Sequence, residues 1–213
     1  MKRIVVLILA LTLITTVACK PTDEDLQVSD EFVTEEYNLD VEGGKIYGTL
    51  TLPKGEGPFT AAIIIQGSGP TDRDGNSGIA GKNNSLKMIS EALAKENIAS
   101  VRYDKRGIGE SAGLVANEED LVFEDYINDV ILWVEKIRED NRFDKVVIIG
   151  HSEGALIGGA AANKTKVEGY VSVAGAGENV YHVLSRQLKA QSEEVFEMCL
   201  PIMEELRKGK LVA

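Results

Sequence analysis

The chain has 213 residues, of which 44% are hydrophobic and 27% charged, and its formal net charge at pH 7 is −11. This length and hydrophobic fraction suit one globular domain with a sizeable core, and nothing in the composition indicates a second domain. The acidic balance argues against a nucleic-acid-binding surface, because such a surface needs clustered Lys and Arg to displace counterions from phosphates. A neutral or cationic small molecule is a more compatible ligand.

The N-terminus has the pattern of a secretory signal. A basic start precedes an apolar run, residues 4–17, that is too short to cross a bilayer as a stable helix. The run ends in Thr16-Val17-Ala18-Cys19, which resembles the lipobox of bacterial lipoproteins except that Thr16 stands where Leu is usual. We therefore predict a signal peptide over residues 1–18 and an exported protein, either lipidated at Cys19 and anchored to the cell envelope or simply cleaved and secreted.

Residues 19–30 are acidic and lack periodicity, as expected of a tether, and the domain begins at about residue 31. Alternating runs at 32–39 and 45–52 flank Glu42-Gly43-Gly44-Lys45, which predicts a β-hairpin. The next apolar run, 61–65, is continuous, as in a strand that is buried on both faces of a parallel sheet.

This strand opens into the loop Gln66-Gly67-Ser68-Gly69-Pro70. A glycine-rich turn at the carboxyl end of a central strand can present a backbone N–H to an oxyanion, and the N–H of Ser68 is the candidate donor. The alternative is a tight turn with no ligand. A dinucleotide site is not indicated, because the full glycine fingerprint is absent and no P-loop lysine follows.

The rest of the chain alternates between helix and strand patterns, which predicts an α/β fold with a mostly parallel sheet and right-handed crossovers. Helices are predicted at 85–97, 119–139 and 178–208, the last interrupted at Pro201, and strands at 99–103, 146–149 and 169–174. In the loop after residue 103, Asp104 and Arg106 suggest an internal ion pair with a structural role.

The segment Gly150-His151-Ser152-Glu153-Gly154 directly follows the strand at 146–149 and precedes a run of small residues suited to a helix packed close on a sheet. In a nucleophile elbow the serine has a strained backbone, and the flanking residues are glycines because a Cβ would collide with neighbouring elements. The turn aims the N–H of Glu153 at an oxyanion. Ser152 is therefore the candidate nucleophile, and a plain turn is the alternative. Ser111 sits in a similar Gly-x-Ser-x-Gly pattern, but no helix follows it, and we interpret it as a loop residue.

Taken in order, these motifs resemble an α/β-hydrolase. Residues 67–76, Gly-Ser-Gly-Pro-Thr-Asp-Arg-Asp-Gly-Asn, together with the Gly-His-Ser-Glu-Gly turn, are similar to bacterial carboxylesterases related to serine aminopeptidases and prolyl oligopeptidase-like hydrolases. The resemblance implies an α/β-hydrolase fold over 31–177, with a mostly parallel sheet flanked by helices, and the start of a helical cap over 178–213. It also implies that Ser152 is the nucleophile, that Ser68 and Glu153 supply the oxyanion N–H groups, and that no cofactor or metal takes part.

The triad of this family runs Ser, then Asp or Glu, then His, and the last two follow later strands that these residues do not contain. Of the two histidines, His151 lies within the elbow with its side chain expected to point away from the serine, and His182 lies in the expected cap, a poor position for a general base. We therefore expect the N-terminal part of a carboxylesterase acting on small-molecule esters through an acyl-enzyme, with its acid and base in a missing C-terminal segment. A related serine peptidase and a catalytically silent truncated product stay open as alternatives.

Overall fold

A computed structural model describes residues 31–78 and 81–210 of the chain. The predicted signal peptide, Cys19 and the tether lie outside the described residues. Among the residues that are described, no helix has the length and apolar character needed to cross a membrane.

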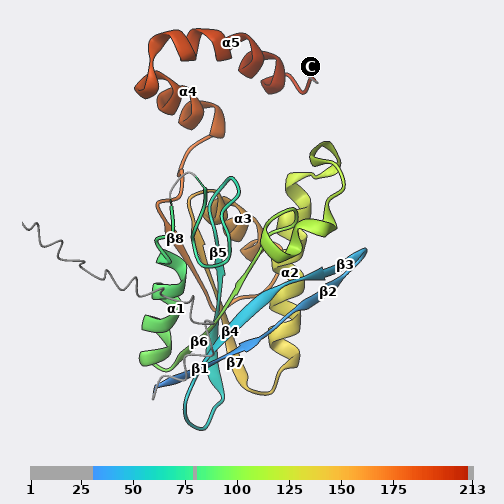
Figure 1. The fold of residues 1–213 in the computed structure, drawn as a ribbon, viewed down its shortest axis with the longest axis vertical. Helices are drawn as coiled ribbons and strands as arrows, with labels where there is room; N and C mark the ends of the chain where they lie inside the picture. Colours follow the sequence, from blue (N-terminus) through green and yellow to red (C-terminus); the bar gives the residue numbers. More distant parts are fainter. Residues whose placement is uncertain (1–30, 79–80, 211–213) are drawn as a thin grey trace, which may run out of the picture.

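The centre of the fold is a mixed, mostly parallel sheet of six strands (Figure 1). In spatial order these are β1 (Phe32–Glu36), β4 (Gly48–Pro53), β6 (Ile98–Tyr103), β5 (Phe59–Ile65), β7 (Phe143–His151) and β8 (Gly169–Val173). The four strands from β6 to β8 run parallel, whereas β1 and β4 are antiparallel to their neighbours. The predicted hairpin forms in two parts, because β1 pairs with β4 while β2 (Leu39–Val41) and β3 (Gly44–Ile46) make a separate small sheet at its tip.

Helices cover both faces of the sheet. They are α1 (Ser85–Lys95), α2 (Phe123–Glu139) and α3 (Glu153–Ala162), and two short 3₁₀ turns, η1 (Gly109–Leu114) and η2 (Glu118–Asp120), precede α2. On α1, the Ser90 hydroxyl bonds to Ser100 of β6, whereas Trp133 of α2 packs in the cluster that contains Val101. Because neighbouring residues of a strand point to opposite faces, α1 and α2 lie on opposite sides of the sheet.

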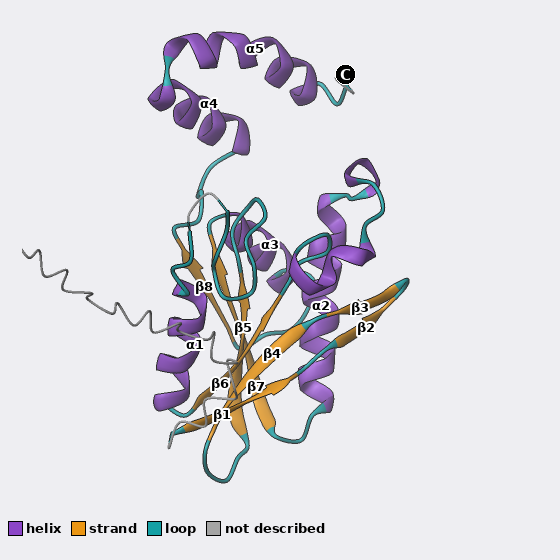
Figure 2. Ribbon diagram, in the orientation of Figure 1, coloured by secondary structure: helices purple, strands orange, loops and turns teal. Residues whose placement is uncertain are grey.

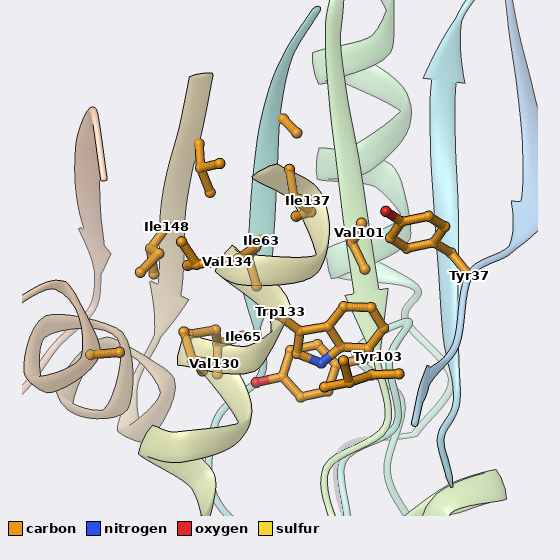
Figure 3. Packing of buried hydrophobic residues seen from close by; sticks show 14 of the residues in the cluster. Tyr37, Ile63, Ile65, Val101, Tyr103, Val130, Trp133, Val134, Ile137 and Ile148 are labelled. Carbon is orange, nitrogen blue, oxygen red and sulfur yellow. The ribbon is translucent and has the colours of Figure 1, made fainter. Parts of the chain in front are cut away.

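The core is largest on the α2 side, where Trp133 is fully buried between two tyrosine rings (Figure 3). Its ring centroid lies 6.0 Å from that of Tyr37 and 5.4 Å from that of Tyr103. The spacing of apolar residues that predicted α2 is confirmed, but the helix begins at Phe123 and not at Glu119. The Asp125 carboxylate accepts the N–H of Val122 at 3.0 Å, which caps the helix at that point.

Residues 178–208 form two helices, α4 (Val180–Gln191) and α5 (Glu193–Arg207), and the break predicted at Pro201 lies instead at Ser192. Ser192 is extended, and its hydroxyl accepts the N–H of Val195 at 3.1 Å, so this side chain begins α5. Pro201 lies inside α5 without ending it. The two helices pack on each other and stand apart from the sheet (Figure 2). Their role as the start of a cap stays a prediction.

One edge of the sheet generates a test of association. β8 pairs with β7, and no strand among residues 31–78 and 81–210 pairs with its other edge. Two large hydrophobic residues of β8 are also partly exposed, Tyr170 at 41% and Val171 at 45%. An apolar strand with free backbone groups is a template for pairing with a second copy. We expect the purified chain to show a mass that rises with concentration in size-exclusion chromatography with light scattering, and Val171→Lys to shift it toward the monomer.

Met88→Lys is the matched control, because Met88 is 63% exposed on α1 and is not part of the sheet edge. The same shift in both variants would point to general surface charge, and a wild-type mass independent of concentration would contradict the expectation.

Candidate active site

Ser152 occupies the sharp turn between β7 and α3, with φ 54° and ψ −117°. A Cβ on Gly150 would stand 2.2 Å from the carbonyl oxygen of Gly154, and a Cβ on Gly154 would stand 2.4 Å from the carbonyl oxygen of Ile65. No side chain fits at either position. The strained serine and the need for both glycines, predicted from the sequence, are therefore confirmed.

The loop after β5 passes directly over this turn. A Cβ on Gly67 would stand 3.2 Å from the Cβ of Ser152 and 3.6 Å from the carbonyl oxygen of His151, so the loop lies close against the turn. Ser68 and Ser152 line one cavity of about 220 Å³, together with Gly67 and His151. The structure thus brings the predicted serine and the predicted oxyanion loop to one place, and Glu153 follows Ser152 as the first residue of α3.

Two backbone donors beside Ser152 have no acceptor in the part of the chain that the structure describes. Within the described residues, the structure records no hydrogen bond from the N–H of Ser68 or from the N–H of Glu153. Glu153 lies in the first turn of α3, where helix N–H groups lack intrahelical partners and the helix dipole is positive. Both N–H groups are therefore open to an acceptor that the described residues do not supply.

Neither histidine forms a catalytic pair with the serine in the part of the chain that is described. His151 lies closer than expected: its Nδ1 is 3.3 Å from the point that a Cβ of Gly67 would occupy, and the residue lines the same cavity as Ser152, so its side chain does not point away from the site. No hydrogen bond joins it to the Ser152 hydroxyl among the described contacts. His182 lies on α4 with its ring edge against Tyr181, at 5.5 Å between centroids.

Lys105 is a site residue that the sequence analysis missed. Its side chain is only 3% exposed, and its ammonium donates to the carbonyl oxygen of Gly67 at 2.9 Å and to the Glu153 carboxylate at 2.8 Å. The same ammonium lies 5.0 Å from the ring centroid of Tyr126. The only signal in the sequence is that this lysine closely follows a buried strand, at the sheet edge where the loop and the elbow also lie.

The predicted ion pair between Asp104 and Arg106 does not form. Asp104 instead pairs with Arg73 at 2.7 Å and accepts the N–H groups of Arg73 and Glu110 at 2.8 and 3.0 Å. The reason is a tight turn at Gly109, where a Cβ would stand 2.4 Å from the Asp104 carboxylate, so the loop folds back over this acid. The structural role of Asp104 holds with these different partners.

Arg106 reaches α2, where it makes a two-point contact with the Asp129 carboxylate at 2.8 and 2.7 Å. Burial raises the pKa of Asp129, and the contact with Arg106 opposes that rise. Ser111 is buried, and its hydroxyl accepts the N–H of Tyr47 at 3.0 Å, which agrees with its interpretation as a loop residue. Among the described residues, no cluster of His, Cys, Asp or Glu is arranged to hold a metal ion.

The fold is similar to that of solved α/β-hydrolase structures. The chain superposes on the Pyrococcus furiosus esterase PF2001 with a TM-score of 0.58 and 16% identity, over 85% of this chain and 63% of that one. For Est1E from Butyrivibrio proteoclasticus the TM-score is 0.55 at 20% identity, over 71% and 56% of the two chains. For XC6422 from Xanthomonas campestris, described as an α/β serine hydrolase without lid, it is 0.51 at 23% identity, over 65% and 60%. The predicted α/β-hydrolase fold is confirmed.

Within this fold class, the model of the family described as serine aminopeptidase, S33, matches residues 76–208, more than half of the chain. The chain belongs to this family. It is also 32% identical over 181 residues to esterase EstD from Thermotoga maritima, covering 83% of this chain. The chain spans 42% of the length of EstD.

The close approach at Gly154 generates a stability test. Gly154→Ala would drive a Cβ to within 2.4 and 2.5 Å of the carbonyl oxygens of Ile65 and Gln66, and both are backbone atoms that cannot turn aside. We expect the free energy of unfolding, measured by denaturant titration, to fall by about 1–3 kcal/mol. Gly113→Ala is the control, because a Cβ there meets nothing within 4 Å. Equal stability of the two variants would mean that the elbow is looser than described.

Proposed function

We propose that the protein is a serine carboxylesterase that acts on small carboxylic esters through an acyl-enzyme on Ser152. One observation carries the proposal: the backbone N–H groups of Ser68 and Glu153 lack an acceptor among the described residues. Ser68 lines the same cavity as Ser152, whose backbone is strained, and Glu153 is the next residue after it. Such donors stabilise the charge that develops on a carbonyl oxygen during acyl transfer. Similarity to EstD supports an ester as the substrate.

In the proposed reaction, the Ser152 oxygen attacks the carbonyl carbon of the ester while a general base takes the hydroxyl proton. The carbonyl oxygen becomes an oxyanion held by the N–H groups of Ser68 and Glu153. Its collapse expels the alcohol, which takes up the proton, and leaves the acyl group on Ser152. Water then attacks the acyl-enzyme by the same route, releasing the carboxylic acid and restoring the serine.

We propose that the general base and its supporting acid come from a further segment of the protein. No hydrogen bond links Ser152 to either His151 or His182 in the described part of the chain, and a base must reach the hydroxyl within hydrogen-bond distance. In this family the triad runs in the order Ser, then acid, then His, which supports an acid and a base that lie later in the chain than β8. The 42% coverage of EstD is compatible with such a segment.

A serine peptidase is the second candidate, favoured by the family description of serine aminopeptidase. The same nucleophile and oxyanion donors would serve amide cleavage, with the amine in place of the alcohol. A catalytically silent product is the third possibility, and the assays below separate the three.

The first assay compares the chain with its Ser152→Ala variant on activated aryl esters and on aminoacyl amides. We expect the rate of the 213-residue chain to lie within about tenfold of the variant, because loss of the base removes most of the advantage of the nucleophile. Extension by the residues encoded after codon 213 of its gene should raise ester turnover at least about a thousandfold over the matching Ser152→Ala variant.

Several outcomes would contradict these expectations. A high Ser152-dependent rate in the 213-residue chain would place the base within it. Faster amide than ester turnover would favour the peptidase. No Ser152-dependent turnover in either form would favour the silent product.

A fluorophosphonate probe should label Ser152 slowly even in the 213-residue chain, because the oxyanion loop is part of it.

We further propose that the protein is exported and lipid-anchored through Cys19, on the strength of its N-terminal sequence pattern. In a bacterial host, the wild-type protein should incorporate labelled palmitate, and it should sediment with the membrane fraction. Cys19→Ala should abolish the label and release the protein, while Cys199→Ala, on α5, should leave both unchanged. Label that persists in Cys19→Ala would contradict anchoring at this residue.

A further inference from the structure

The Lys105 ammonium joins the two segments that supply the proposed oxyanion donors. It donates to the Gly67 carbonyl in the loop after β5 and to the Glu153 carboxylate at the start of α3, at 2.9 and 2.8 Å. The contact with Glu153 and the burial of the lysine side chain make these charge-assisted bonds, which are stronger than neutral ones. Lys105 itself follows β6, so three strand ends meet at one cation.

The bond to Gly67 constrains a neighbouring atom that it does not touch. The Gly67 C=O and the Ser68 N–H belong to one peptide unit, which is planar and trans, so the two groups point in opposite directions. A ligand that holds the carbonyl therefore also sets the direction of the Ser68 N–H. This peptide turns about ψ of Gly67 and φ of Ser68, and Gly67 has no side chain to restrict that rotation.

The bond from Lys105 to Glu153 offsets the negative charge of the Glu153 carboxylate. Glu153 contributes its N–H to the proposed oxyanion site, yet its own carboxylate is negative and would oppose a developing oxyanion nearby. The Lys105 ammonium lies 2.8 Å from that carboxylate and neutralises it. One buried cation thus orients one donor and offsets the unfavourable charge beside the other.

We propose that Lys105 is a positioning residue of the acyl-transfer site, which holds the Gly67–Ser68 peptide in the orientation that presents the Ser68 N–H to the oxyanion and cancels the charge of Glu153. This inference rests on the proposed function. Lys105 touches no reacting atom, and its effect passes through Ser68 and Glu153.

A nearby ion pair provides the matched control. Arg106 is the next residue along the same loop and pairs with the nearly fully buried Asp129, but no contact joins it to Gly67, Ser68 or Glu153 among the described residues. Arg106→Met therefore removes a cation from the same loop and leaves a buried carboxylate unpaired, without releasing the oxyanion loop.

The experiment measures ester hydrolysis by Lys105→Met and Arg106→Met in the extended, active form, and the rate of Ser152 labelling by a fluorophosphonate in the 213-residue chain. We expect Lys105→Met to lower kcat and the labelling rate by about a hundredfold to a thousandfold, the effect of losing one oxyanion donor, with KM changed far less. Arg106→Met should keep both rates within about threefold, although both variants lose stability.

A double variant separates the two roles. Lys105→Met combined with Glu153→Gln removes the uncompensated carboxylate but leaves the Gly67 carbonyl without its donor. We expect it to recover part of the lost kcat and not all of it. Full recovery would limit the role of Lys105 to charge, and equal losses of kcat in Lys105→Met and Arg106→Met would overturn the proposal.

A crystal structure of Lys105→Met gives a readout that does not depend on catalysis. A rotated Gly67–Ser68 peptide supports the proposal, and an unchanged peptide overturns it. If the extended wild-type form shows no Ser152-dependent ester hydrolysis, the proposed function fails, and the peptide orientation still decides whether Lys105 holds the loop.

Discussion

The fold depends on a backbone contact that leaves no room for a side chain, between the start of α3 and the end of β5. The position of a Cβ on Gly154 lies 2.4 Å from the Ile65 carbonyl oxygen, and Ser152, two residues earlier in the same turn, has a positive φ. Because the start of α3 lies so close to the end of β5, the first N–H groups of α3, which lack intrahelical acceptors, lie next to the loop that follows β5. Backbone geometry, more than side-chain chemistry, assembles the site.

Charged side chains then secure the loops around this contact. Lys105, Arg106 and Asp104 are consecutive in the chain, yet each binds a different partner: the oxyanion loop with the elbow, helix α2, and Arg73. Three adjacent side chains thus fix one loop in three directions. Removing one partner of such a buried ionic contact is costly, because it leaves the other charge uncompensated.

The sequence predicted the features that depend on neighbouring residues. The elbow at Ser152 could be found because strand, glycines and helix are contiguous, and α2 could be found from its apolar spacing. Contacts over long separations could not: Lys105 lies 38 residues from Gly67 and 48 from Glu153. The break at Ser192 was missed because a capping hydroxyl outweighed the proline that the pattern emphasised.

Trp133 has a consequence for spectroscopy. It is the only tryptophan in the chain, and it is fully buried between Tyr37 and Tyr103 on the α2 side of the sheet. Its emission therefore reports the polarity and packing of that one interior region, far along the sheet from the β8 edge. Tryptophan emission of this protein therefore follows the loss of the central core, whereas α4 and α5 contain no indole that would report their own rearrangement.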